Sequence, residues 1–199
     1  MAHQRLSSRL VARVAALVAL SVMADVFPMP RVFFGMKLDL VGTVWVSGFL
    51  LFGFETATYV SLGTFLLMSF YGTTGFVGAA MKFAATYPMI FVPWLMFRRT
   101  AKESMLAPST RGALFYGFAS VTAIAVRVLV TFLLNYYWAI PVFMGLPIEQ
   151  VIQRFFSGSF LEFFAFIAGL NVIQGTLDAA LPWLIVVRSG LVRVLRERS

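Results

Sequence analysis

The sequence lacks cysteine altogether and contains a single histidine. The absence of cysteine excludes disulfide bonds, thiolate catalysis and cysteine metal sites. Charged residues are also scarce, at 12% of the chain, whereas soluble domains carry about 25%. No His-Glu-x-x-His motif, acidic metal cluster or phosphate-binding glycine loop followed by lysine occurs. We therefore expect a protein that is not an enzyme and that holds neither a metal nor a cofactor.

Apolar residues, by contrast, make up 60% of the chain. A soluble fold could not hide this much apolar surface with so few charges to cover its outside, whereas lipid can cover it. At about 20 residues per membrane crossing, a chain of 199 residues accommodates six helices with short loops. We expect one all-α membrane domain over residues 1–199, a compact bundle of six transmembrane helices.

Six apolar runs fit this expectation, at residues 10–27, 40–54, 56–71, 78–97, 112–140 and 160–187. The first run is interpreted as a retained helix, with a cleaved signal peptide as the alternative. The second and third runs are barely long enough for a hydrocarbon core of about 30 Å, so we expect them to pack inside the bundle. Pro141 should end the fifth run, and Pro147 should open a short amphipathic surface helix.

Basic residues flank these runs unevenly. The side that holds both termini carries eleven of them (Arg5, Arg9, Arg13, Arg98, Arg99, Lys102, Arg111, Arg188, Arg193, Arg196 and Arg198), and the other side carries four (Arg31, Lys37, Lys82 and Arg154). Positive charge concentrates on the cytoplasmic side of membrane proteins, so both termini are predicted to be cytoplasmic. The same placement explains the net charge of +8 without nucleic-acid binding.

Polar side chains recur within the fifth and sixth runs, where each is costly unless it is paired or faces a cavity. The two sets are Arg127, Thr131 and Asn135, and Asn171, Gln174 and Asp178. Their spacing of three or four residues places each set on one helix face. The amides and hydroxyl suit a neutral, planar, hydrogen-bonding ligand, or they hydrogen-bond between helices without a ligand. Arg127 and Asp178 are expected to form a structural ion pair.

Two further patterns each allow two interpretations. Tyr136, Tyr137 and Trp138 at the outer end of the fifth run form either an interfacial aromatic belt or a stacking wall beside the polar residues. In the first run, small residues recur at four-residue spacing, in the pairs Ala12 with Ala16 and Ala15 with Ala19. Such small residues let helix backbones approach closely, within the chain or with a partner.

Three short stretches resemble the substrate-binding S components of energy-coupling factor (ECF) vitamin transporters, above all the riboflavin-binding members. Met36-Lys37-Leu38-Asp39-Leu40 is similar to the family's Leu-Lys-x-Asp signature. Residues 134–141, Leu-Asn-Tyr-Tyr-Trp-Ala-Ile-Pro, are similar to its Asn-Tyr-Phe then Pro. Residues 170–175, Leu-Asn-Val-Ile-Gln-Gly, are similar to its Phe-Asn-x-x-Lys-Gly. The chain departs from the pattern at Gln174, where the family has Lys, and at Val41-Gly42, where it has Ser-Asp.

The resemblance implies a protein of the prokaryotic cell membrane that binds riboflavin from outside, as a transported ligand rather than a cofactor. It then associates with a membrane coupling protein that two ATPase subunits drive. The residues expected at the ligand are Asn135, Asn171, Gln174, Lys37, Asp39, Thr131 and Tyr136. The alanines of the first run, Ala12, Ala15, Ala16 and Ala19, are expected at the coupling protein. The alternatives are an S component for another vitamin, a scaffold subunit that transports nothing, and a self-sufficient small transporter.

Overall fold

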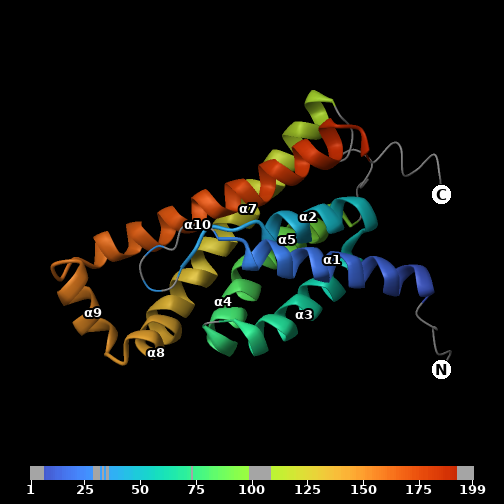
Figure 1. The fold of residues 1–199 in the computed structure, drawn as a ribbon. Helices are drawn as coiled ribbons and strands as arrows, with labels where there is room; N and C mark the ends of the chain where they lie inside the picture. Colours follow the sequence, from blue (N-terminus) through green and yellow to red (C-terminus); the bar gives the residue numbers. More distant parts are fainter. Residues whose placement is uncertain are drawn as a thin grey trace, which may run out of the picture.

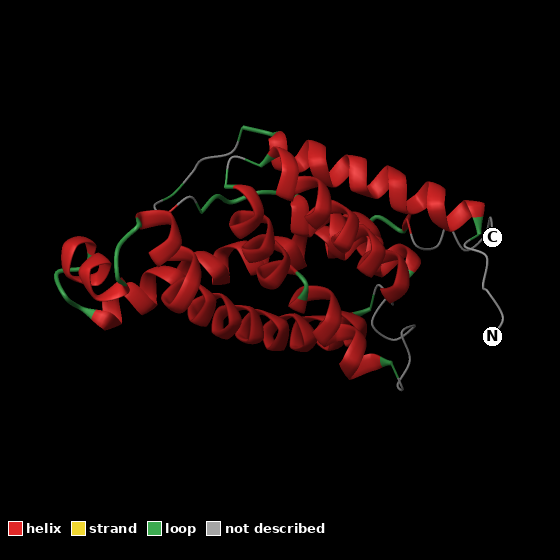
Figure 2. Ribbon diagram, turned by 90° about the horizontal axis from the view of Figure 1, so that it is seen from below, coloured by secondary structure: helices red, strands yellow, loops and turns green. Residues whose placement is uncertain are grey.

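The structure is a computed structural model that describes residues 7–28, 32, 34, 36–72, 74–98 and 109–191. Within these residues the chain is all-helical and contains no β-strand (Figures 1 and 2). The helices, of which η2 and η3 are π-helical, are α1 (Ser8–Val26), α2 (Val41–Phe52), α3 (Phe54–Tyr71), α4 (Gly75–Thr86), α5 (Pro88–Phe97), α7 (Thr110–Leu134), η2 (Asn135–Ala139), α8 (Ile140–Met144), α9 (Ile148–Phe155), α10 (Phe160–Pro182) and η3 (Trp183–Arg188).

Serine residues set the starts of three helices. Ser7, Ser109 and Ser159 precede α1, α7 and α10, and each adopts an extended backbone conformation. Each serine hydroxyl accepts a hydrogen bond from the backbone N–H three residues further on, over 3.1–3.2 Å. Because the first N–H groups of a helix have no partner within it, these hydroxyls stabilise the helix ends.

Within the described part of the chain, three continuous helices are long and apolar enough to cross a membrane: Gly75–Phe97, Thr110–Met144 and Phe160–Arg188. The second of them corrects the prediction that Pro141 ends the fifth run. Pro141 lacks the N–H that an α-helix needs, but the helix widens into η2 just before it and continues as α8. A π-helical segment changes the hydrogen-bond spacing, which lets the helix pass through the proline.

The short second run forms the centre of the bundle, as predicted. Most residues of α2 are buried, and Val41 and Trp45 have no exposed surface. At about 1.5 Å per residue, the 12 residues of α2 span roughly 18 Å, well short of a hydrocarbon core. The helix instead packs against α1, α3, α5 and α10, and its apolar side chains hold these helices together.

A second apolar cluster lies where α8 and α9 meet α10. Its buried members are Ile140, Ile148, Val151, Ile152, Phe163 and Ile167. The predicted amphipathic helix after Pro147 is present as α9, whose buried residues fall on one face. In Figure 1, α8 and α9 lie at the left end of the bundle, whereas α1 begins and η3 ends at the right. Both described chain ends therefore lie at the same end of the bundle.

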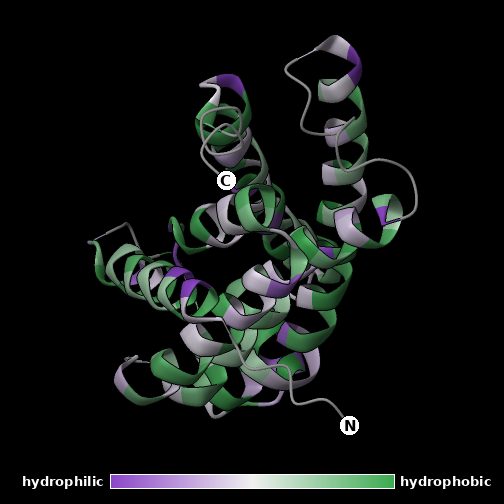
Figure 3. Cartoon of the chain, turned by 90° about the vertical axis from the view of Figure 1, so that its right-hand side faces the viewer, coloured by the Kyte–Doolittle hydropathy of each residue, from purple (hydrophilic) through white to green (hydrophobic). Residues whose placement is uncertain are grey.

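The outer surface of the bundle is strongly apolar. Leu114, Phe118 and Val121 on α7 are 65–70% exposed, and Leu161 on α10 is 74% exposed. Figure 3 shows apolar residues along most helices. Such a surface fits a lipid environment, as the composition predicted. The six crossings and the cytoplasmic orientation stay predictions. Of the basic residues on which the orientation rests, seven lie outside the described residues: Arg5, Arg31, Arg99, Lys102, Arg193, Arg196 and Arg198.

Candidate functional site

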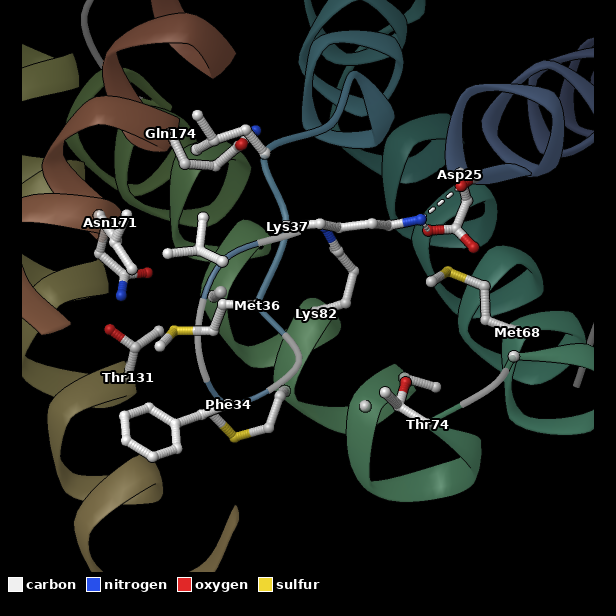
Figure 4. Close-up of a pocket in the computed structure, with 18 of the residues that line it drawn as sticks. Asp25, Phe34, Met36, Lys37, Met68, Thr74, Lys82, Thr131, Asn171 and Gln174 are labelled. Carbon is white, nitrogen blue, oxygen red and sulfur yellow. Dashed lines mark hydrogen bonds and ion pairs between the residues drawn. The ribbon is translucent and has the colours of Figure 1, made fainter. Parts of the chain in front are cut away.

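A cavity of about 600 Å³ lies inside the bundle, within the described residues (Figure 4). Its walls come from the C-terminal ends of α1 and α3, from α4, α7 and α10, and from the connector, by which we mean the described residues between α1 and α2. The apolar lining side chains include Val32, Phe34, Met36, Leu38, Met68, Met81, Phe143 and Leu170. This volume lies in the range of sites that enclose small molecules.

The predicted ion pair between the two polar helix faces is confirmed. Arg127 Nη1 on α7 lies 2.7 Å from Asp178 Oδ2 on α10, and both side chains are buried. Arg127 Nε also donates to Asn171 Oδ1 over 3.1 Å. These contacts connect α7 to α10 at the wall of the cavity, because Arg127 and Asn171 are among its lining residues.

Gln174 lines the cavity, but its amide is bound to the connector rather than free. Its Oε1 accepts from the backbone N–H of Asp39 over 3.0 Å, and its Nε2 donates to the carbonyl of the same residue over 2.8 Å. Its second N–H donates to Asp178 Oδ1, also over 2.8 Å. Asp39 Oδ1 in turn accepts from the N–H of Val41, the first residue of α2. Gln174 therefore fixes the connector where it enters α2.

The other predicted polar residues of α7 and α10 line the cavity with groups that are partly engaged. Thr131 Oγ1 donates to the carbonyl of Arg127, and Asn135 Nδ2 donates to the carbonyl of Thr131, each over 2.8 Å. Asn171 Nδ2 donates to the carbonyl of Ile167 over 2.9 Å. Asn135 Oδ1 accepts no hydrogen bond from any described residue, so it is available to a ligand. All three lining residues are buried.

Lys37 lies on the opposite side of the cavity and ties the connector to α1. Its ammonium lies 2.7 Å from Asp25 Oδ1 and also donates to the backbone carbonyl of Asp25 (Figure 4). Tyr71, the last residue of α3, donates its hydroxyl to Asp25 Oδ2 over 3.2 Å. The connector is thus held at Asp39 by Gln174, and two residues earlier, at Lys37, by Asp25.

Lys82 is a residue of the site that the sequence does not identify. The distribution of basic residues assigns it to the side of the membrane opposite the termini. The structure instead puts it about two turns into α4, in the cavity wall, where its ammonium pairs with Asp39 Oδ2. A single lysine inside an apolar run was the available signal, because a charged side chain at membrane depth is costly without a partner or cavity. Asp25 at the end of the first run carried the same signal.

Three sets of predicted residues are not among the lining residues of the cavity: Asp39, which the resemblance predicts at the ligand but which lies behind Lys82 and Gln174, then Tyr136, and the alanines of the first run. Tyr136 packs against Phe132, Phe160 and Phe163, with ring centroids 6.0–6.2 Å apart, and is not among the lining residues. The alanines of α1, at positions 12, 15, 16 and 19, are exposed on the bundle surface.

No family model and no curated protein sequence matches this chain. Among solved structures, the chain is similar to the S component of a bacterial ECF transporter, with a TM-score of 0.64. The alignment covers 94% of this chain and 97% of that chain, at 17% sequence identity. Over nearly their whole lengths, the two chains share a fold, and the fold expected from the resemblance is confirmed to that extent.

Proposed function

We propose that this chain is the S component, the substrate-binding membrane subunit, of an ECF-type importer. The observation that carries the proposal is the cavity of about 600 Å³, which the connector helps to line in a chain that shares the fold of an S component. The role is binding and delivery rather than catalysis, and it involves no cofactor.

For the ligand we propose riboflavin or a related vitamin with a planar ring. The wall formed by α7 and α10 offers Thr131, Asn135 and Asn171 as hydrogen-bonding groups, and Asn135 Oδ1 is free to accept. Methionine and phenylalanine side chains of the connector and α3 supply the apolar contact that a ring requires. Gln174 contributes indirectly, because both its amide N–H groups are already used to hold Asp39 and Asp178.

The proposal includes partners. The exposed alanines of α1, Ala12, Ala15, Ala16 and Ala19, form a surface on which another helix backbone could pack closely. We assign this surface to the membrane coupling protein, which two ATPase subunits drive in the cell membrane of a prokaryote. These partners supply the energy for transport, and this chain supplies the binding site.

A scaffold subunit that transports nothing is the second candidate, and one observation favours it. Asn171 and Gln174 hydrogen-bond to other parts of the chain, as polar residues that only join helices would. A scaffold, however, does not need a cavity lined by a free acceptor and several cationic side chains. The two candidates differ in ligand binding.

The test is an absorption spectrum of the detergent-solubilised chain, followed by titration with riboflavin. A copurified ligand with the yellow absorption of a flavin, and saturable binding after its removal, are the expected results. A chain that copurifies with no small molecule and binds none from a vitamin panel would favour the scaffold. Uptake into liposomes without ATPase subunits would instead indicate a self-sufficient transporter.

A further inference from the structure

The ion pairs around the cavity share one orientation, in which the cation is the more exposed partner. The side-chain exposures are 20% and 9% for Lys37 and Asp25, 15% and 1% for Lys82 and Asp39, and 4% and 0% for Arg127 and Asp178. All three cations line the cavity, but among the carboxylates only Asp25 does. The wall therefore presents N–H donors and positive charge to a ligand, with Asp39 and Asp178 behind them.

Of the two lysines in the cavity wall, Lys82 has more donor capacity left than Lys37. An ammonium group carries three N–H donors. Lys37 uses two of its donors, one on the carboxylate and one on the carbonyl of Asp25, whereas Lys82 has Asp39 Oδ2 as its partner among the described residues. Neither N–H of Gln174, which reaches Asp39 from the other side, is free. Of the two side chains that hold Asp39, Lys82 is therefore the one that keeps N–H donors for a ligand.

We propose that Lys82 contacts the ligand directly through its ammonium group, and that the cavity takes ligands whose buried edge is rich in hydrogen-bond acceptors. Such ligands are uncharged or anionic; a cationic ring is rejected. This inference rests on the proposed function and adds to it a contact residue and a charge class for the substrate.

The charge class follows from the same geometry. A ligand edge rich in acceptors would accept hydrogen bonds from the unused N–H groups of Lys82. Such charge-assisted hydrogen bonds are stronger than neutral ones. A cationic ring would instead face Lys37, Lys82 and Arg127 across a wall whose carboxylates are already paired. Opposing like charges in a binding site strongly disfavour the wrong partner.

The experiment is isothermal titration of the detergent-solubilised chain with three probes. Riboflavin represents an uncharged ring with carbonyl oxygens, biotin a carboxylate, and thiamine a cationic ring. The proteins are the wild type, Asp39→Asn and the double variant Lys82→Met/Asp39→Asn. The double variant leaves neither an unpaired carboxylate nor an unpaired ammonium, and in both variants the asparagine can still accept from the N–H of Val41. Thermal unfolding of each purified variant checks that it is folded.

We expect wild type to bind riboflavin or biotin and not thiamine. The step from Asp39→Asn to the double variant isolates the ammonium group, and it should weaken binding by roughly 10- to 100-fold, the size of a charge-assisted hydrogen bond. As a matched control, Arg154→Met removes one positive charge from an exposed position of α9 and should leave affinity unchanged.

Each other outcome overturns the inference. Equal affinity in Asp39→Asn and the double variant would remove Lys82 from the ligand contacts while leaving the proposed S-component function intact. Binding of thiamine by wild type would overturn the charge class and, with it, the flavin assignment, although a vitamin-binding subunit would remain. A folded wild type that binds none of the three probes would overturn both the inference and the proposed ligand.

Discussion

The two sides of the cavity are built differently. On the α7–α10 side, Thr131, Asn135 and Asn171 each donate to the carbonyl four residues earlier in their own helix. On the other side, two ion pairs hold the connector, one made by Lys37 and one by Lys82. We call the first side the wall, because the polar side chains on it are already fixed by their own helices. We call the second side the tied side, because ion pairs join its separate segments. We expect the wall to tolerate little change and the tied side to lose a contact at a smaller cost.

The largest effect should come from the ion pair inside the wall. Asp178→Leu leaves the Arg127 guanidinium buried without its carboxylate, which should lower the free energy of unfolding by about 3–5 kcal/mol. Thermal unfolding in detergent measures this loss. The double variant Arg127→Met/Asp178→Leu removes both charges and should regain most of the stability. An Asp178→Leu protein as stable as wild type would show that the wall does not depend on the pair.

A smaller loss is expected where α2 touches the wall. A Cβ at Gly42 would lie 2.3 Å from Asp178 Cγ, so Gly42→Ala forces the carboxylate away from its partners. We expect a decrease in the free energy of unfolding of about 1–3 kcal/mol, as for other overpacked sites. Gly117→Ala on α7 is the matched control, because its Cβ would meet nothing within 4 Å. Equal melting temperatures for the two variants would contradict the close contact.

Substitutions of the two asparagines in the wall should affect ligand affinity and thermal stability to different extents. Asn135→Ala removes the free acceptor Oδ1 and should weaken riboflavin binding by about 1–3 kcal/mol, with little change in melting temperature. Asn171→Ala should lower both the affinity for riboflavin and the melting temperature, because Arg127 also loses an acceptor. Titration and thermal unfolding of both variants, with Thr176→Ala on the exposed face of α10 as control, measure the difference. Unchanged affinity in both asparagine variants would exclude them from the site.

The smallest effect should come from the tied side. Tyr71→Phe removes one hydrogen bond to Asp25, which Lys37 still neutralises, and should reduce the free energy of unfolding by about 0.5–1.5 kcal/mol. Tyr59→Phe, on the same helix, should have no measurable effect, because Tyr59 is about as exposed as Tyr71 but its hydroxyl bonds to no described residue. A loss in Tyr71→Phe as large as that in Asp178→Leu would show that the two sides are equally rigid.

The sequence predicts the wall well and the tied side poorly. Residues of the wall recur with helical spacing, so periodicity alone places Arg127, Asn171 and their neighbours on two polar helix faces. The partners of the tied side are 43 residues apart for Lys82 and Asp39, and 135 apart for Gln174 and Asp39. Such pairs depend on how the helices pack, which periodicity does not show. For that reason the sequence assigns Gln174 to the ligand and does not reveal its bonds to the connector.

The π-helical segment η2 has a consequence for how this chain can vary in length. A π-helical turn holds one residue more than the α-helical turn that it replaces. Deleting exposed Tyr137 would therefore convert η2 to α-helix and leave Asn135 and α8 in place. The same deletion at Leu129, in the regular part of α7, would rotate everything after it by about 100° around the helix axis. Homologues that lack this turn should show their one-residue gap between 135 and 139, directly after the asparagine that lines the cavity.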